Sequence, residues 1–145
     1  MTEVEFHTGV AEPTLFACRL LRKAARTGVR VQVTALPEVL ALLDRQLWTF
    51  EERDFVPHLR CPGATAAVAA RTPIWLTPSA MAGDAPRVLV NLGAEAPADV
   101  QSLDRLIEIV SAEPDDAAAG RLRWRAYKAQ GLAIKHHAQA GGEAG

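Results

Sequence analysis

The chain has 145 residues, of which 49% are hydrophobic and 23% are charged, and its formal net charge is −1 at pH 7. This composition predicts one folded domain with a sizeable core, and it excludes a chain that is disordered throughout or attracted as a whole to nucleic acid or acidic membranes. Two cysteines without paired spacing, no amino-terminal signal and no apolar run of about 18 residues predict a soluble protein of the reducing cytoplasm.

The first third of the chain is expected to form a βαβ unit followed by a second helix. The expected elements are a short strand at residues 4–6 ending in a loop at 7–9, a helix over 13–27, a strand over 29–33 and a helix from about residue 37 to 48. Apolar residues recur at helical spacing from Leu15 to Ala25, whereas Val29–Val33 alternates like a strand. A strand, a helix and a second strand in this order favour a parallel pair.

The rest of the chain continues this alternation of strands and helices. Residues 60–71, which are rich in alanine around Pro62-Gly63, are expected to form a small mobile loop. Strands are expected at 73–77, 87–92 and 106–110, a loop at 79–86, a short helix at 99–103 and a final helix over 115–130 that ends at Gly131. The sequence therefore predicts an α/β fold, a three-layer sandwich with a mostly parallel sheet, over residues 1–137, with a disordered tail over 138–145.

Signatures of nucleotide binding and of catalysis are missing from the sequence. The segment His7–Pro13, between the first strand and the first helix, has a single glycine, too few for a dinucleotide fingerprint, and no phosphate loop is present. Cys18 lies on the apolar face of a helix, and Asp115 and Asp116 are explained by the dipole of the helix that they begin. We expect no catalytic residues and no intrinsic polymerase, nuclease or nucleotide-hydrolysing activity. The alternative is a small α/β enzyme or nucleotide-binding protein whose site lacks a known signature.

Metal-ligand spacing is also missing. His58 and Cys61 are three residues apart, but no second ligand pair has matching spacing. His136 and His137 are expected in a frayed terminus. The sequence therefore predicts no bound metal and no cofactor.

Aromatic residues beside charges are the remaining candidates for function. Arg121, Trp124, Arg125, Tyr127 and Lys128 fall in the last turns of the final helix, where arginines suit carboxylates and aromatic rings suit an apolar side chain. The alternative is a solvated cationic face with aromatic residues in the core. A second group, Trp48, Phe50, Phe55 and Pro57, is read equally well as a protein contact or as core.

The order and spacing of these segments resemble the chi subunit of bacterial DNA polymerase III holoenzyme over residues 3–132. The resemblance rests on Leu47-Trp48 followed by Phe55-Val56-Pro57-His58, and on the closing Arg-Trp-Arg-Ala-Tyr-Lys-Ala-Gln-Gly at 123–131. Trp124 departs from the better-known relatives, which carry Tyr, and the loop over 60–72 is unusually rich in alanine.

The resemblance implies a Rossmann-like fold without a nucleotide site and a non-catalytic adaptor of the clamp loader in DNA replication. It implies that the protein binds the acidic, Phe-terminated tail of single-stranded-DNA-binding protein, and touches nucleic acid mainly indirectly. The implied tail site comprises Arg121, Trp124, Arg125, Tyr127 and Lys128, with Arg125 as the main carboxylate partner. The implied contact with the psi subunit, or with a repair helicase, centres on Trp48 and Phe55.

Overall fold

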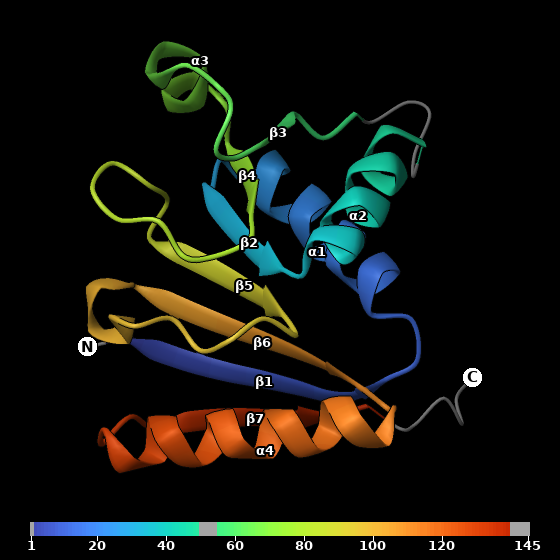
Figure 1. Ribbon diagram of the computed structural model, residues 1–145, viewed down its shortest axis with the longest axis vertical. Coiled ribbons are helices and arrows are strands. Elements are labelled where there is room, and N and C mark those ends of the chain that lie inside the picture. The colour runs from blue at the N-terminus through green and yellow to red at the C-terminus, as the bar shows by residue number, and fades with distance from the viewer. Residues whose placement is uncertain (1, 50–54, 140–145) are drawn as a thin grey trace.

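The computed structural model describes residues 2–49 and 55–139, which form one sheet with helices on both faces (Figure 1). In chain order the elements are β1 (Glu3–Val10), α1 (Pro13–Arg26), β2 (Val31–Ala35), α2 (Pro37–Thr49), β3 (His58–Arg60), α3 (Ala66–Arg71), β4 (Ile74–Thr77), β5 (Val88–Leu92), the 3₁₀ helix η1 (Val100–Ser102), β6 (Arg105–Ser111), α4 (Pro114–Ala129) and β7 (Ile134–Ala138). None of the helices in these two ranges combines the length and apolar character needed to cross a bilayer.

The sheet has the order β3-β4-β2-β5-β6-β1-β7, and every pairing between its seven described strands is parallel. An isolated antiparallel bridge joins Ala35, the last residue of β2, to Gly93, which follows β5. The expected α/β sandwich with a mostly parallel sheet is confirmed. Each parallel connection needs a crossover, and α1, α2, α3 and α4 lie in such crossovers.

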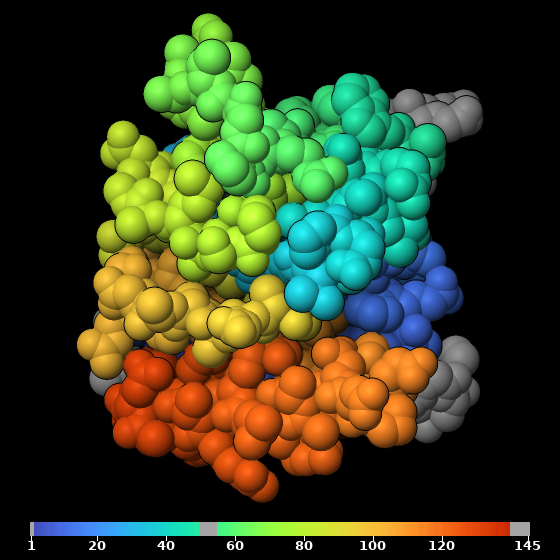
Figure 2. Space-filling view, in the orientation of Figure 1, coloured from blue at the N-terminus to red at the C-terminus, as the bar shows by residue number. Residues whose placement is uncertain are grey.

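The layers follow from the alternation of side chains along each strand. In β6, Ile107 and Ile109 join the core beneath α1 and α2, whereas Leu106 and Val110 join the core beneath α4. Figure 1 shows α1 and α2 apart from α4, and Figure 2 shows α4 as a continuous outer layer along the lower side of the molecule. The central strands are buried on both faces, which explains their nearly continuous apolar sequence.

The predicted boundaries of the long helices agree with the observed ones to within one residue. Pro13 begins α1 at a position where proline needs no backbone donor, and the chain leaves the helix through Gly28, whose φ of 78° is left-handed. Asp115 and Asp116 stand in the first turn of α4, where acids complement the helix dipole.

Three expectations about the less regular segments are wrong. The first strand does not end at Phe6: β1 continues to Val10, because β6 and β7 supply backbone partners on its two sides. The loop expected over 60–71 begins with the last residue of β3 and contains the helix α3. The end of α3 is held where the Trp75 indole donates to the carbonyls of Ala69 and Thr72. His136 and His137 lie in β7, not in a frayed terminus.

Two parts of the earlier predictions fall outside the described residues. Phe50, named with the aromatic group, belongs to the range 50–54, and most of the expected tail belongs to 140–145. Ala138, where that tail was expected to begin, is the last residue of β7. A disordered tail beyond β7 stays a prediction.

Candidate functional site

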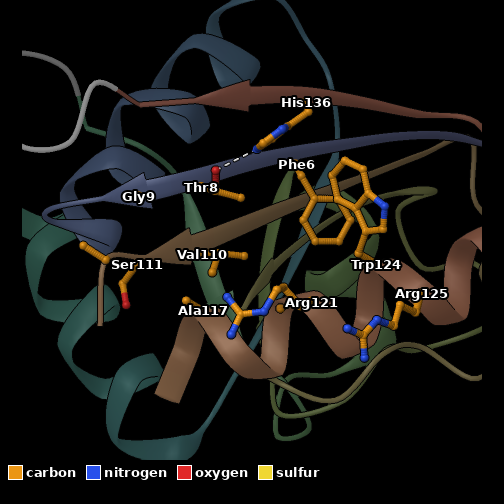
Figure 3. Close-up of a pocket in the computed structure, with 12 residues that line it drawn as sticks. Phe6, Thr8, Gly9, Val110, Ser111, Ala117, Arg121, Trp124, Arg125 and His136 are labelled. Carbon is orange, nitrogen blue, oxygen red and sulfur yellow. Dashed lines mark hydrogen bonds between the residues drawn. The ribbon is translucent and has the colours of Figure 1, made fainter. Parts of the chain in front are cut away.

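A pocket of about 610 Å³ opens between α4 and the carboxyl ends of β1 and β6, beside β7 (Figure 3). Its apolar floor and walls come from all four elements, and two arginines of α4 stand at its α4 side. The lining residues are Phe6, Thr8, Gly9, Val110, Ser111, Ala112, Ala117, Gly120, Arg121, Trp124, Arg125 and His136.

Gly120 sets how closely α4 approaches the sheet. A Cβ atom at this position would lie 2.9 Å and 3.0 Å from the two methyl carbons of Val110, closer than side chains tolerate. The glycine thus allows α4 to pack directly on β6, although glycine inside a helix costs about 1 kcal/mol relative to alanine. Sequence analysis missed this residue; a glycine in the middle of an otherwise helical pattern was the available signal.

Trp124 forms a fixed wall of the pocket. Its ring packs against Phe6 of β1, with centroids 4.9 Å apart and planes inclined by 56°. His136 of β7 also meets the indole edge to face, with centroids 5.2 Å apart, and His136 Nε2 lies 2.7 Å from Thr8 Oγ1. Trp124 is half-buried, and contacts on two strands hold its orientation.

Arg121 and Arg125 are exposed and lie one helical turn apart on α4. In the described part of the chain no carboxylate pairs with either guanidinium, so both remain available to an anionic ligand. Figure 3 shows both on the α4 side of the pocket, with the rings of Phe6 and Trp124 beyond them. Lys128 is also exposed on α4 but does not line the pocket.

Tyr127, predicted to touch the same ligand, is placed differently. Its side chain is fully buried, and its hydroxyl donates to Glu108 Oε2 at 2.6 Å. A ligand on the surface cannot reach a ring at this depth, so the direct contact predicted for Tyr127 is incompatible with the structure. Tyr127 instead packs behind Phe6, with ring centroids 5.9 Å apart, and supports the wall of the pocket.

A buried polar network around Glu108 fixes the inner side of α4. Arg123 Nε donates to Glu108 Oε1 at 3.0 Å, and Asn91 Nδ2 donates to Oε2 at 3.0 Å. Burial raises the pKa of Glu108, and the Arg123 guanidinium opposes that rise. Burial and the adjacent carboxyl raise the pKa of Tyr127. An acidic residue within the apolar run Leu106–Val110 was the sequence signal for this network.

Trp48 and Phe55 form an aromatic patch near the carboxyl end of α2. Their ring centroids are 4.8 Å apart, and the two residues are 63% and 46% exposed. The alternative that these two residues belong to the core is therefore wrong. We call this pair the aromatic patch.

His58 holds the aromatic patch in place from beneath. Its ring lies 5.7 Å from Trp48 and 5.8 Å from Phe55, and its side chain is almost fully buried. His58 Nε2 lies 2.7 Å from Asp44 Oδ1, and Nδ1 lies 2.7 Å from the Val56 carbonyl oxygen. Contacts at both ring nitrogens hold the imidazole in place. His58, considered above with Cys61 as a metal ligand, therefore has a structural role.

Comparisons with known proteins agree on one family. The family model described as DNA polymerase III chi subunit, HolC, matches residues 1–135. The chain is also 34% identical over 142 residues to a curated protein of Pseudomonas aeruginosa, DNA polymerase III subunit chi, and the match covers 94% of this chain and 96% of that relative.

Proposed function

The chain belongs to the DNA polymerase III chi subunit family, and from this premise we propose that it is a non-catalytic accessory subunit that links two proteins. Its membership places it among the DNA polymerase III subunits of DNA replication. In the proposal, the pocket beside α4 binds the acidic C-terminal tail of single-stranded-DNA-binding protein, and the aromatic patch binds the psi subunit of the clamp loader. No reaction is assigned to the chain.

The proposed binding of the acidic tail is supported by an apolar pocket beside two arginines that have no carboxylate partner among the described residues. Phe6, Val110 and Trp124 offer a surface suited to one aromatic side chain, and Arg121 and Arg125 stand beside it. A peptide that ends in phenylalanine carries a ring and a free carboxylate on the same residue. The ring would occupy the apolar part while a guanidinium binds the carboxylate.

Arg125 is the chief partner of the C-terminal carboxylate of the peptide. Arg121 and Lys128 attract acidic residues that precede the phenylalanine. All three cations are exposed, and the attraction of Arg121 and Lys128 for acidic residues of the peptide is a pairing of exposed charges, which contributes only about 0–1 kcal/mol. A hydrogen bond to a charged group contributes about 1.5–3 kcal/mol. Arg125→Ala should therefore weaken binding roughly ten- to a hundredfold, and Arg121→Ala should weaken it less.

Calorimetric titration tests this assignment with a short acidic peptide ending in phenylalanine, as the free acid and as the C-terminal amide. Arg19→Ala is the matched control, because it removes an equal charge from an exposed position on α1. We expect Arg125→Ala and amidation each to weaken binding, and Arg19→Ala to leave the affinity within about twofold. Equal affinities for acid and amide, and for Arg125→Ala and the unmodified protein, would exclude the carboxylate clamp.

The aromatic patch supports the second half of the proposal. Large exposed rings are uncommon on a monomer surface and are typical of the centre of a protein interface. Trp48 and Phe55 are exposed yet held in contact with one another and with His58, so little conformational entropy is lost on docking. A repair helicase that uses the same patch would compete with psi.

Replacement of Trp48 by alanine tests this surface. We expect loss of psi from a pull-down, corresponding to about 2 kcal/mol or more, without loss of folding stability. Leu122→Ala is the control, since Leu122 is equally exposed at 64% but lies on α4. If Trp48→Ala retains psi as well as Leu122→Ala does, psi docks elsewhere.

A further inference from the structure

A second cluster of polar side chains lies at the same edge of the sheet as the pocket but on its opposite face. Glu5 and His7 are two residues apart on β1, so their side chains leave the same face of the strand. His137 of β7 is the register partner of His7, and the two imidazoles stack with centroids 4.7 Å apart and planes inclined by 13°. Phe16 of α1 contacts the His7 ring, which identifies this face as the one covered by α1.

The three side chains bring potential metal ligands together. Glu5 Oε2 lies 3.4 Å from His137 Nε2, and Glu5 Oε1 lies 3.7 Å from His7 Nε2. One ligand atom from each of the three lies within 4.8 Å of the others. Ligands of a tetrahedral Zn²⁺ ion at about 2.0–2.2 Å from the metal are about 3.4 Å apart. To bind one ion, the two imidazoles have to rotate out of their parallel stack so that their lone pairs converge.

The position of His7 decides which of its nitrogens faces the cluster. Nε2 lies 3.7 Å from Glu5 Oε1, whereas Nδ1 is buried on the other side of the ring and has no hydrogen-bond partner in the described part of the chain.

Arg105 is the group that would compete with a cation here. Its Nη2 donates to Glu5 Oε1 at 3.1 Å. The other carboxylate oxygen, Oε2, faces His137, so Glu5 can retain the arginine through one oxygen and use the second as a ligand. The side chain of His137 is 44% exposed, which gives an ion a path from solvent and the ring room to rotate.

We propose that Glu5, His7 and His137 form a site for one Zn²⁺ ion, which joins the edge strand β7 to β1. Two imidazoles and one carboxylate are a familiar set of three protein ligands for zinc, with the fourth position left to water. The ion would also stabilise the strand whose other face presents His136 to the pocket. The site stands independently of the function proposed above, because none of its ligands lines the pocket.

Calorimetric titration of the untagged, chelator-treated full chain with Zn²⁺ tests the site. We expect one ion per chain, with His7→Ala and His137→Ala each weakening binding at least about tenfold. His136→Ala is the matched control: it removes a histidine from the same strand whose ring faces α4, and Zn²⁺ affinity should stay within about twofold. Mg²⁺ should not bind, because it prefers oxygen ligands.

A second readout does not depend on the variants folding. In the unmodified protein, Zn²⁺ should shift the ring NMR signals of His7 and His137 and leave those of His58 unchanged. The proposal is overturned if the unmodified chain takes up no Zn²⁺, if His137→Ala binds Zn²⁺ as tightly as the unmodified chain, or if Mg²⁺ binds equally well.

Discussion

At the scale of single residues, a substitution of Tyr127 distinguishes a side chain that supports the pocket from one that contacts its ligand. Tyr127→Phe removes the hydroxyl that donates to Glu108 at 2.6 Å but keeps the ring behind Phe6. We expect the free energy of unfolding in urea to fall by about 1–3 kcal/mol, because a buried carboxyl loses a donor. Affinity for the acidic peptide should stay within about twofold. Unchanged stability together with weakened binding would show that the hydroxyl contacts the ligand directly.

Cys18 gives a pH dependence at the same scale. Burial raises the pKa of its thiol from 9.0 to about 11. The unfolded chain therefore releases this proton first, and stability that is fully present below pH 9.0 is lost as the pH rises towards about 11. Relative to Cys18→Ala, which lacks the thiol, the free energy of unfolding should fall by up to about 1.4 kcal/mol per pH unit in that window. Parallel pH profiles for the two proteins would contradict a buried thiol.

At the scale of elements, β7 has the most consequences for the pocket. It covers the outer edge of β1 and supplies His136, which packs on Trp124. A chain shortened to end at Ala133 should bind the acidic peptide at least about tenfold more weakly, and its uncovered β1 edge should promote self-association in sedimentation experiments.

The control for this truncation is a chain that ends at Gln139 and so retains β7. It should behave as the full chain in both measurements. Should the chain ending at Ala133 bind the peptide normally, the edge strand has no part in shaping the pocket.

At the scale of the whole molecule, the two proposed binding surfaces lie on opposite faces of the sheet. The pocket belongs to the α4 face, and the aromatic patch lies at the end of α2, which packs on the other face. Figures 1 and 2 show α2 and α4 as separate parts of the surface. A central sheet between two sites permits both partners to bind at once.

Independence of the two surfaces can be measured with a double-mutant cycle. Trp48→Ala should leave the affinity for the acidic peptide unchanged. In the double variant, the changes in peptide-binding free energy caused by Trp48→Ala and by Arg125→Ala should add within about 0.3–0.5 kcal/mol, as expected for distant sites. Arg125→Ala should equally leave psi binding intact. A coupling energy above about 1 kcal/mol would mean that one surface alters the other.

Much of the fold could be predicted because its determinants are local. Apolar residues at helical spacing, Pro13 at a helix start and Gly131 after a helix end act within a few residues, and they located α1, α2 and α4. The same periodicity placed Arg121, Trp124 and Arg125 together, because residues three and four apart share a helix face. All three line the pocket.

What the sequence could not decide was which side chains are buried and which strands pair, because both depend on residues far away in the chain. In the sequence Tyr127 stands among cations, a pattern typical of a surface contact. In the structure it is buried against Glu108 and Phe6, which come from two strands. The segment at β7 lacks a strong strand pattern and becomes a strand because the edge of β1 offers backbone partners. His137 lies beside Glu5 and His7 only through that pairing, more than a hundred residues along the chain, so the proposed metal site exists in the tertiary structure alone.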